Sequence, residues 1–416
     1  ENFNVSYVLS NNLPKEKFNR KVCYYQKIEN KSVNKRFGYR TFLLMYRAKN
    51  KSKTFQFRVE RMLFPLKFNI KYIQNLQKLK NIEKIRKVMF FFLRVFFNKL
   101  KYSKVKLLSY ETIFQIFSKK IYSIEKKNKS LEDCFLRTKP DLIILPFGSQ
   151  ELEMPQIVNF CKNNKIKSYF ITDNWDNLSS KSIIEDKPDI VGVWGEQAKN
   201  HASEIQNFTE NQIITLGSPR FDIIYERRDK IIQQHHKFDY VLFLGHLFDW
   251  NEEDVIEILD NEISSKKEFY NNTKIIYRPH PQRISRARTI NLSNVIIDDD
   301  VKEQGTYWPS LNNYFNNIQN SMFVMGSLTT GLLESTAFYK RYMLLCYNDE
   351  YDFFSQGSLL NKYTHVQDLK KIDTIEFCDQ KIDITTKFRN LFKEKKNGVE
   401  FKTSNEISYF ITGNKN

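Results

Sequence analysis

The sequence has few cysteines and no long apolar segment, and each shortage excludes a class of protein. Five cysteines are scattered over 416 residues without a Cys-x-x-Cys pair. This spacing argues against both a disulfide framework and a zinc site, and it indicates a reducing compartment such as the cytoplasm. The longest apolar run, Val88–Leu93, is followed at once by Arg94. It is far shorter than the roughly 20 apolar residues that a membrane-spanning helix needs.

Several well-known catalytic motifs are also missing. The sequence contains no G-x-x-x-x-G-K-[ST], no H-E-x-x-H, no G-x-S-x-G and no G-x-G-x-x-G. Their absence disfavours a P-loop NTPase, a zinc protease, a serine hydrolase and a typical dehydrogenase. No metal-ligand spacing is seen either, so we expect neither a metal nor another cofactor.

Acidic residues are scarce at one end of the chain. Residues 1–130 contain 32 Lys and Arg against seven acidic residues, all of them Glu, while the formal net charge of the whole chain is +18. The positive excess therefore belongs to the N-terminal segment alone. It indicates either a polyanionic partner, such as nucleic acid or an anionic membrane surface, or only the Lys-rich composition of the chain.

A basic and aromatic stretch within this segment has a helical period. One face of residues 82–101 carries Ile and Phe side chains, and Lys and Arg flank it. A core-facing helix of the first domain explains this stripe. A helix that lies in a membrane interface explains it as well, and both interpretations stay open.

From residue 131 onward, short apolar runs alternate with helical stretches, which predicts an α/β fold with parallel sheets covered on both faces. A polar stretch over 225–239 separates two such series. The sequence therefore predicts two Rossmann-like domains that face a cleft, residues 1–217 with the basic aromatic segment and residues 218–416. The predicted strands cover residues 141–145, 167–171, 190–194, 213–216, 240–244, 274–277, 294–297, 322–325 and 341–347.

Polar residues follow one strand of the second domain and open a helix. In open parallel sheets, ligands bind outside the carboxyl ends of the strands. Backbone N–H groups at the helix start, together with the hydroxyls of Ser327, Thr329 and Thr330, would hold a phosphate. Glu334, one turn later, could reach a ribose hydroxyl. Ordinary helix capping by Ser327 or Thr329, without any ligand, is the alternative.

Two further strand ends of this domain are polar. Arg278 and His280 lie in an Arg-Pro-His-Pro sequence whose prolines restrict the backbone. An arginine offers a two-pronged donor to phosphate and a histidine can donate to a phosphoryl oxygen. His246 follows a third strand. These residues predict a nucleotide-diphosphate site, with a turn that merely exposes Arg278 as the alternative.

In the first domain, Asp173, Trp175 and Asp176 directly follow a predicted strand. A carboxylate that faces a cleft can deprotonate an attacking hydroxyl, and a Trp ring offers a flat surface to a sugar. The alternative is helix capping by Asp176, or a turn without any ligand. Ser149, after another strand, and Arg220, at the end of the domain, are further candidates for binding an acceptor.

Four segments resemble bacterial GT-B glycosyltransferases that build surface polysaccharide, and the related teichoic-acid type CDP-glycerol glycerophosphotransferases. They are ITDNWDNLSSK (171–181), LGSPRFD (216–222), YRPHP (277–281) and MGSLTTGLLES (325–335). The resemblance extends over roughly residues 100–400. It implies two Rossmann-like domains, with a donor nucleotide in the second, an acceptor in the first, and no bound metal.

The resemblance also implies roles for single residues. His280 and the segment 327–330 would contact the donor phosphates, and Glu334 matches the acidic residue that commonly binds ribose. Asp173 or Asp176 would be the base that takes the acceptor proton. The polyol-phosphate enzymes usually carry an Asp-Tyr-Ser-Ser type sequence where this chain has Gly-Ser-Leu-Thr at 326–329. This departure favours sugar transfer.

The resulting hypothesis is a cytoplasmic glycosyltransferase of capsule or lipopolysaccharide synthesis. It would transfer a sugar from a nucleotide-sugar donor to a glycan or lipid-linked acceptor. Peripheral contact of the basic segment with an anionic membrane fits the same hypothesis. The alternatives are a CDP-polyol phosphotransferase, a nucleotide-sugar epimerase, and a basic membrane- or nucleic-acid-binding protein without enzymatic activity. We expect no nucleic acid partner, because the polar strand ends concentrate in the part of the chain that is not basic.

Overall fold

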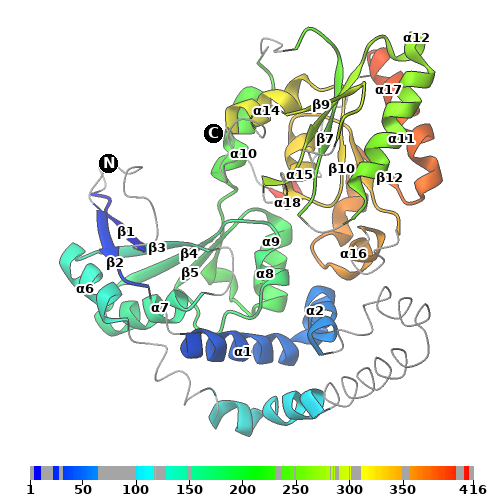
Figure 1. Ribbon diagram of the computed structural model, residues 1–416. Helices are drawn as coiled ribbons and strands as arrows, with labels where there is room; N and C mark the ends of the chain where they lie inside the picture. The colour runs from blue at the N-terminus through cyan, green and yellow to red at the C-terminus, as the bar shows by residue number, and fades with distance from the viewer. Residues whose placement is uncertain are drawn as a thin grey trace. The chain divides into compact units, whose positions relative to one another are not determined.

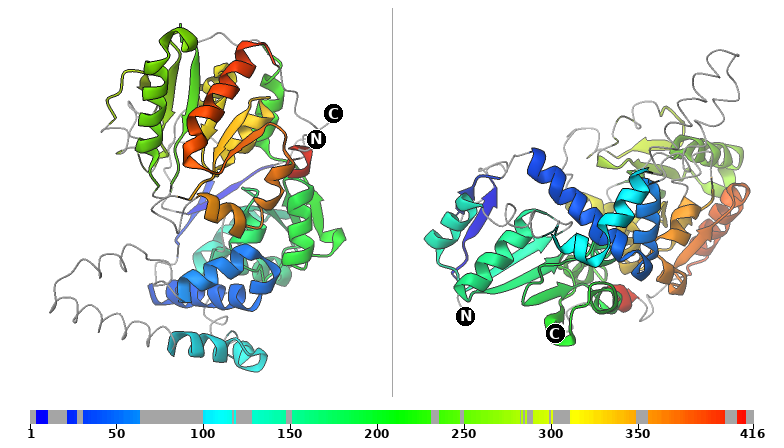
Figure 2. Two further views of the ribbon diagram at one scale, coloured as in Figure 1. Left: turned by 90° about the vertical axis from the view of Figure 1, so that its right-hand side faces the viewer. Right: turned by 90° about the horizontal axis from the view of Figure 1, so that it is seen from below.

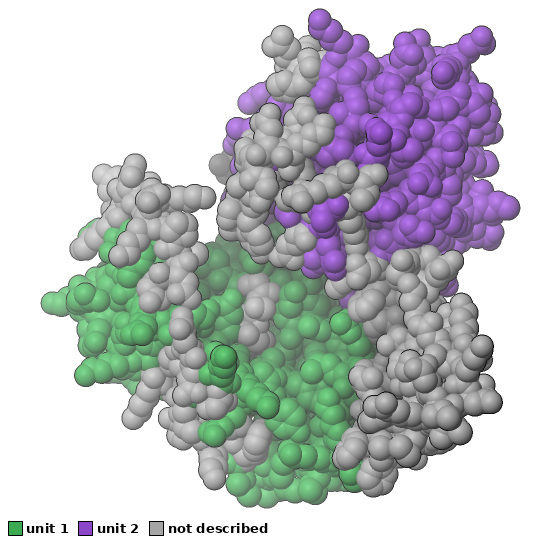
Figure 3. All heavy atoms as spheres, in the orientation of Figure 1, with its two compact units in different colours: residues 1–216 green, residues 217–416 purple. Residues whose placement is uncertain are grey.

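The computed structural model divides the chain into two compact units, residues 1–216 and 217–416 (Figure 3). The candidate basic helix, except for residues 100 and 101, lies outside the part that the structure describes. The described residues are 4–10, 22–27, 31–63, 100–116, 118, 128–147, 151–230, 236–247, 250–281, 283, 285, 290–298, 300, 311–348, 356–399 and 407–411.

Unit 1 is built on a parallel sheet whose strands follow one another in chain order, β3-β4-β5-β6. Their bounds are β3 (Leu142–Phe147), β4 (Lys167–Thr172), β5 (Ile190–Val193) and β6 (Ile213–Thr215). The helices after β3, β4 and β5 are α7 (Glu153–Asn164), α8 (Asn177–Ser180) and α9 (Glu196–Asn200), which continues as a π-helical turn, η4 (His201–Ile205).

The apolar residues of unit 1 form two main clusters. The first packs α6 (Lys129–Thr138) and α7 against the sheet, and the rings of Phe135 and Phe160 meet in it at 4.9 Å between centroids. The second packs α1 (Lys31–Arg47) and α2 (Lys53–Leu63) with the helical segments over 100–108 and 111–116. A separate parallel pair, β1 (Tyr7–Ser10) and β2 (Val22–Tyr25), lies beside α6.

Unit 2 contains a six-stranded parallel sheet in the order β12-β11-β10-β7-β8-β9. From β7 the chain moves to one side through β8 and β9, then returns to the other side of β7 for β10, β11 and β12. The direction of winding therefore reverses between β7 and β10, which makes this junction the topological switch point of a doubly wound sheet. The strand bounds are β7 (Tyr240–Leu244), β8 (Lys274–Arg278), β9 (Val295–Ile297), β10 (Val324–Gly326), β11 (Tyr342–Leu345) and β12 (Ile375–Cys378).

Helices cover both faces of this sheet, which explains why its strands are continuous apolar runs (Figures 1 and 2). One face carries α11 (Glu252–Ser265), α12 (Lys267–Tyr270) and α17 (Ile384–Lys396). The other carries α10 (Pro219–Arg227), α14 (Leu311–Asn320), α15 (Thr330–Ala337) and α18 (Ile407–Phe410). The short helix α16 (Gln356–Lys362) follows β11.

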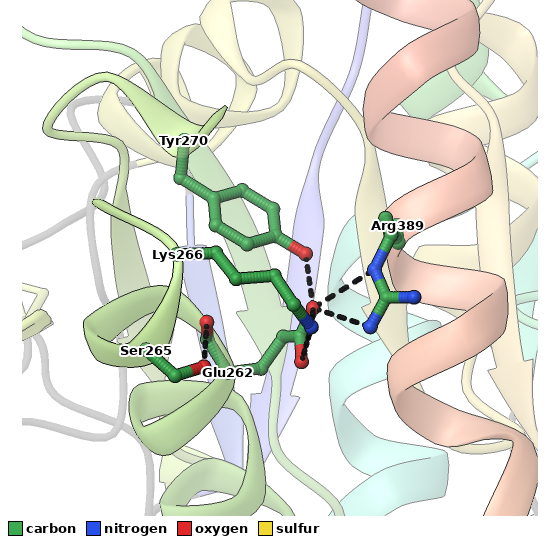
Figure 4. A network of polar contacts seen from close by, with 5 residues as sticks. All are labelled: Glu262, Ser265, Lys266, Tyr270 and Arg389. Atoms are coloured by element: carbon green, nitrogen blue, oxygen red, sulfur yellow. Dashed lines mark hydrogen bonds and ion pairs between the residues drawn. The ribbon is translucent and has the colours of Figure 1, made fainter. Parts of the chain in front are cut away.

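A polar network joins the three helices of the first face (Figure 4). The buried Glu262 accepts hydrogen bonds from Lys266 Nζ at 2.7 Å, Tyr270 Oη at 2.8 Å and Arg389 Nη2 at 2.8 Å. Burial alone would raise the pKa of Glu262, but these three donors lower it overall. The network fixes α17 against α11 and α12.

The α/β class with two Rossmann-like units is confirmed. Every predicted strand has a counterpart, while β1, β2 and β12 were not predicted. Among the described residues, no helix is both long enough and apolar enough to span a lipid bilayer.

Candidate functional site

The predicted donor residues gather along one edge of the sheet in unit 2. His246 follows β7, Arg278 ends β8 with His280 two residues later, and the segment 327–330 follows β10. Because all strands are parallel, their carboxyl ends lie at the same edge. Asp298, which follows β9, is at this edge as well and was not predicted.

Ser327 stands at the switch point itself. It is 0% exposed, and its Oγ has no hydrogen-bond partner. Its carbonyl oxygen accepts a hydrogen bond from Tyr342 Oη at 2.9 Å. A buried hydroxyl without a partner costs roughly 1–3 kcal/mol, so such a group in a native fold points to a ligand or to water.

The loop after β10 is held close to β7. Gly326 has a φ of +152°, and a Cβ on it would lie 2.4 Å from the carbonyl oxygen of Leu244. No other residue type fits this approach without a shift of the backbone. Thr329 is the N-cap of α15, but its side chain makes no capping hydrogen bond. Ordinary side-chain capping by Ser327 or Thr329 is therefore wrong as an explanation of these hydroxyls.

Glu334 on α15 is fully buried and its two oxygens have different partners. Arg220 Nε donates to Oε1, and Tyr314 Oη donates to Oε2 at 2.6 Å. Burial would lower the pKa of Arg220, but the neighbouring Glu334 carboxylate raises it overall. Burial and the same carboxylate raise the pKa of Tyr314, which keeps its hydroxyl protonated as a donor. Glu334 thus joins α10, α14 and α15, and its predicted contact with ribose stays a prediction.

Arg278 is part of the same polar network and is 7% exposed. Its Nη1 donates to Asp298 Oδ2 at 2.6 Å, and its Cζ lies 4.9 Å from the centroid of the Tyr314 ring. The alternative of a turn that merely exposes Arg278 is therefore wrong. Its charge is already opposed by Asp298, which weakens the attraction that it could offer to a phosphate; that role also stays a prediction.

The two histidines differ in their surroundings. His246 is buried, and its backbone N–H donates to Glu252 Oε1 at 2.7 Å, while Tyr277 Oη donates to Glu252 Oε2 at 2.6 Å. His280 is only half-buried. Sequence reasoning missed Glu252, because an acidic residue in the first turn of a helix is ordinary at the surface and nothing local marked it as buried.

The predicted acceptor-side residues lie in the loop after β4. Asp173 is exposed, and Asn177 Nδ2 bridges Asp173 Oδ1 at 2.5 Å and the carbonyl oxygen of Phe147 at 2.7 Å. Asp176 is half-buried, and its Oδ2 accepts from Ser180 Oγ at 2.6 Å. Its side chain makes no capping hydrogen bond to the backbone, so the capping alternative is wrong here too.

The structure places Trp175 and Arg220 differently from what their predicted contact with an acceptor requires. Trp175 is 6% exposed, so protein already covers the ring that was expected to offer a flat surface to a sugar. Arg220, expected to meet an acceptor, belongs to unit 2 and pairs with Glu334. Ser149 lies outside the described residues.

No group of three or more His, Cys, Asp and Glu side chains in the described part of the chain could hold a metal ion. The candidate site contains hydroxyls, histidines and a helix N-terminus.

No family model matches the sequence, and no curated protein matches it. Solved structures similar to this chain include a UDP-GlcNAc 2-epimerase from Methanocaldococcus jannaschii, at 14% identity and a TM-score of 0.44, covering 71% of this chain and 80% of that one. A putative UDP-N-acetylglucosamine 2-epimerase from Listeria monocytogenes has 11% identity and a TM-score of 0.42, with 73% and 79% covered. The wall teichoic acid polymerase TagF has 11% identity and a TM-score of 0.36, with 76% and 92% covered. At these values the likenesses assign neither an activity nor a substrate to this chain.

Proposed function

We propose that the protein is a glycosyltransferase that binds a nucleotide-activated sugar at the switch point of unit 2. The observation that carries this proposal is the buried Ser327 hydroxyl, which lacks a partner beside the N-terminus of α15. A helix N-terminus attracts negative charge, and an adjacent hydroxyl can donate to a phosphoryl oxygen. A nucleoside diphosphate supplies the anion that both groups can bind.

The same groups would stabilise the leaving nucleotide during transfer. Negative charge develops on the phosphate oxygen as its bond to the sugar breaks, and fixed donors lower the energy of that state. Ser327, Thr329 and Thr330 surround the start of α15. His246 follows the neighbouring strand β7, and His280 follows β8, the next strand along the sheet. Since Asp298 opposes the charge of Arg278, the N-terminus of α15 and the hydroxyls would provide most of this stabilisation.

Unit 1 would bind a glycan or lipid-linked acceptor. In the proposed step, the acceptor oxygen bonds to the sugar carbon, the bond from that carbon to the phosphate oxygen breaks, and a carboxylate takes the acceptor proton. Asp173 suits this role better than Asp176, because it is exposed, while Asp176 also lies 3.6 Å from Lys181 Nζ. Asp173→Asn should lower kcat at least tenfold without changing the affinity for the donor.

A donor-binding experiment tests the central claim. Thermal unfolding of the full chain would be followed with UDP, GDP, CDP, dTDP and CMP and with their sugar derivatives, since a ligand of the native state raises the unfolding temperature. We expect one nucleotide to stabilise the protein and Ser327→Ala to weaken its binding at least tenfold. The variant itself should fold, because it removes a hydroxyl that has no partner.

Ser321→Ala is a matched control at the opposite end of β10. Its Oγ is also buried but donates to the carbonyl oxygen of Ile318 at 2.7 Å. Its loss should cost about 1 kcal/mol of stability and leave nucleotide affinity unchanged. If no nucleotide stabilises the protein, or if Ser327→Ala binds as well as wild type, the donor site is not at the switch point.

Product analysis separates the alternatives that share this site. Incubation with a nucleotide-sugar alone would yield a second nucleotide-sugar if the protein were an epimerase, whereas a transferase needs an acceptor. A CDP-polyol phosphotransferase would release CMP and keep the phosphate on the product.

The basic residues 1–130 are proposed to rest on an anionic membrane where lipid-linked acceptors lie. Co-sedimentation with vesicles of phosphatidylglycerol, compared with phosphatidylcholine alone, measures this contact. Tight, salt-sensitive binding to DNA or RNA with no nucleotide binding would instead favour the non-enzymatic alternative.

A further inference from the structure

Unit 2 contains a cavity of about 260 Å³ that the proposed donor site does not use. It lies against β8 and β9, on the side of β7 away from the switch point. Its apolar wall is formed by Ile276, Ile296 and Ile297. Five polar side chains also line it: His236, Asp298, Asp300, and Asn313 and Asn317, which are one turn apart on α14.

The carboxylates of the cavity are unequal in their hydrogen bonding. Asp298 Oδ2 accepts from Arg278 Nη1 at 2.6 Å and from Asn317 Nδ2 at 3.0 Å. Asp300 Oδ1 accepts from Asn313 Nδ2 at 2.7 Å. Asp300 Oδ2 is buried and has no hydrogen-bond partner, although Arg278 Nη1 lies 3.8 Å away.

Asp300 Oδ2 could therefore accept a hydrogen bond from a ligand in the cavity. The Asp300 side chain is only 10% exposed, and a buried carboxylate oxygen that lacks a donor is costly. With His236 counted as neutral at pH 7, the two carboxylates and the one guanidinium of Arg278 leave the cavity with a net negative charge. A positively charged donor would supply the missing hydrogen bond to Asp300 Oδ2 and would balance the negative charge of the cavity. Hydrogen bonds with an ionised partner are about twice as strong as neutral ones.

We propose that this cavity binds a small flat molecule with a cationic nitrogen group, an amidinium or a protonated amine. Its N–H groups would donate to Asp300 Oδ2, and its apolar body would lie on the three isoleucines. Ligand pockets commonly combine a mostly apolar wall with a few polar groups that orient the ligand. The preference for a cation is opposite in sign to that of the switch point, so the two sites should not compete for one ligand.

Benzamidine is the probe, since it is flat, aromatic and positively charged, and benzamide is its uncharged counterpart of nearly the same shape. Isothermal titration of the full chain should detect benzamidine and give at least tenfold weaker binding of benzamide. Asp300→Asn should weaken benzamidine binding at least tenfold, because it removes the negative charge while it keeps an acceptor for Asn313. Thermal stabilisation by the nucleotide that binds the donor site should not change.

A second variant protects the test against misfolding of the first. Ile296→Phe adds volume to a half-buried wall residue of the edge strand β9, and it should abolish benzamidine binding in a folded protein. The proposal is overturned if wild type does not bind benzamidine, if benzamide binds equally well, or if either folded variant binds benzamidine like wild type.

Discussion

The two sheets are made of the same kinds of strand and helix but differ in the order of their strands. In unit 1 each strand is added beside the previous one, whereas in unit 2 the chain returns to the far side of β7. Beyond β4, the carboxylates of Asp173 and Asp176 accept hydrogen bonds from their own loop. Beyond β10, the buried hydroxyl of Ser327 has no such partner. The reversal of the winding direction between β7 and β10, more than the local sequence, distinguishes the edge of the unit 2 sheet as suited to a ligand.

Each unit also contains an ion pair with one buried and one more exposed member. In unit 2 the buried member is the acid, since Glu334 is 1% exposed and Arg220 is 44% exposed. In unit 1 the buried member is the base, since Arg40 is 3% exposed and Glu185 is 33% exposed. Arg40 Nε has a second acceptor, Ser118 Oγ at 2.9 Å.

Of the variants compared here, Arg220→Met should lower the free energy of unfolding most. It leaves Glu334 buried with only the hydroxyl of Tyr314, and we expect a loss of about 3 kcal/mol in unit 2. Glu185→Gln should cost about 1 kcal/mol in unit 1, because Arg40 keeps Ser118 and gains a neutral acceptor. Hydrogen exchange with mass spectrometry, performed across a urea series, measures the stability of each unit separately.

The double variant Arg220→Met with Glu334→Gln is the control. Because it removes the buried charge as well, it should recover most of the loss. Equal losses for Arg220→Met and Glu185→Gln would show that the two pairs do not differ as the burial of their members implies.

Two buried glycines give the next largest contrast. A Cβ at Gly326 would meet the backbone oxygen of Leu244 at 2.4 Å, whereas a Cβ at Gly192 in β5 would meet the end of the Leu216 side chain at the same distance. A side chain can turn away, but a paired strand cannot. Gly326→Ala should therefore cost about 2 kcal/mol, and Gly192→Ala less than about 1 kcal/mol. Similar losses in urea unfolding would show that the backbone of β7 does not restrict position 326 more than a side chain restricts position 192.

The smallest effect concerns a pH dependence confined to unit 1. Burial raises the pKa of Asp186 from 3.8 to about 6, although Arg40 opposes the shift. An acid whose pKa is raised by folding holds extra protons in the native state, so its contribution falls as pH rises from about 4 to 6. Asp186→Asn should stabilise unit 1 at pH 7.5 by about 1–2 kcal/mol, less than two pKa units would give, because the side chain is only half-buried and water screens part of its charge.

This gain should disappear at pH 4, where the wild-type Asp186 is protonated. Thermal unfolding of both proteins at pH 4, 6 and 7.5 follows the difference, and Asp173→Asn is the exposed control with no expected gain. A stabilisation that is equal at all three pH values would show that charge burial is not its cause.

Continuous apolar runs and the polar residues that follow them were enough to predict the central strands and the edge at which candidate residues meet. The edge strand β12 has the sequence Ile-Glu-Phe-Cys, and its charged residue interrupts the apolar run that marks a central strand. The partners of the site residues were not predictable, because they come from distant parts of the chain. Tyr314 and Arg220 meet Glu334 only through the packing of α10 and α14 on α15.

The pairing of β7 with β10 also has a consequence for the order of folding. Val324 pairs with Leu242, about 80 positions earlier, and β8 and β9 are formed by the chain between them. Closing so long a loop is entropically costly and slow, so this pairing should form after the local β7–β8 and β8–β9 contacts. During synthesis, the backbone N–H and C=O groups at the β10 side of β7 then stay unpaired until residues 324–326 leave the ribosome. The interval in which this chain is most exposed to aggregation and to chaperones should therefore end when the switch point forms.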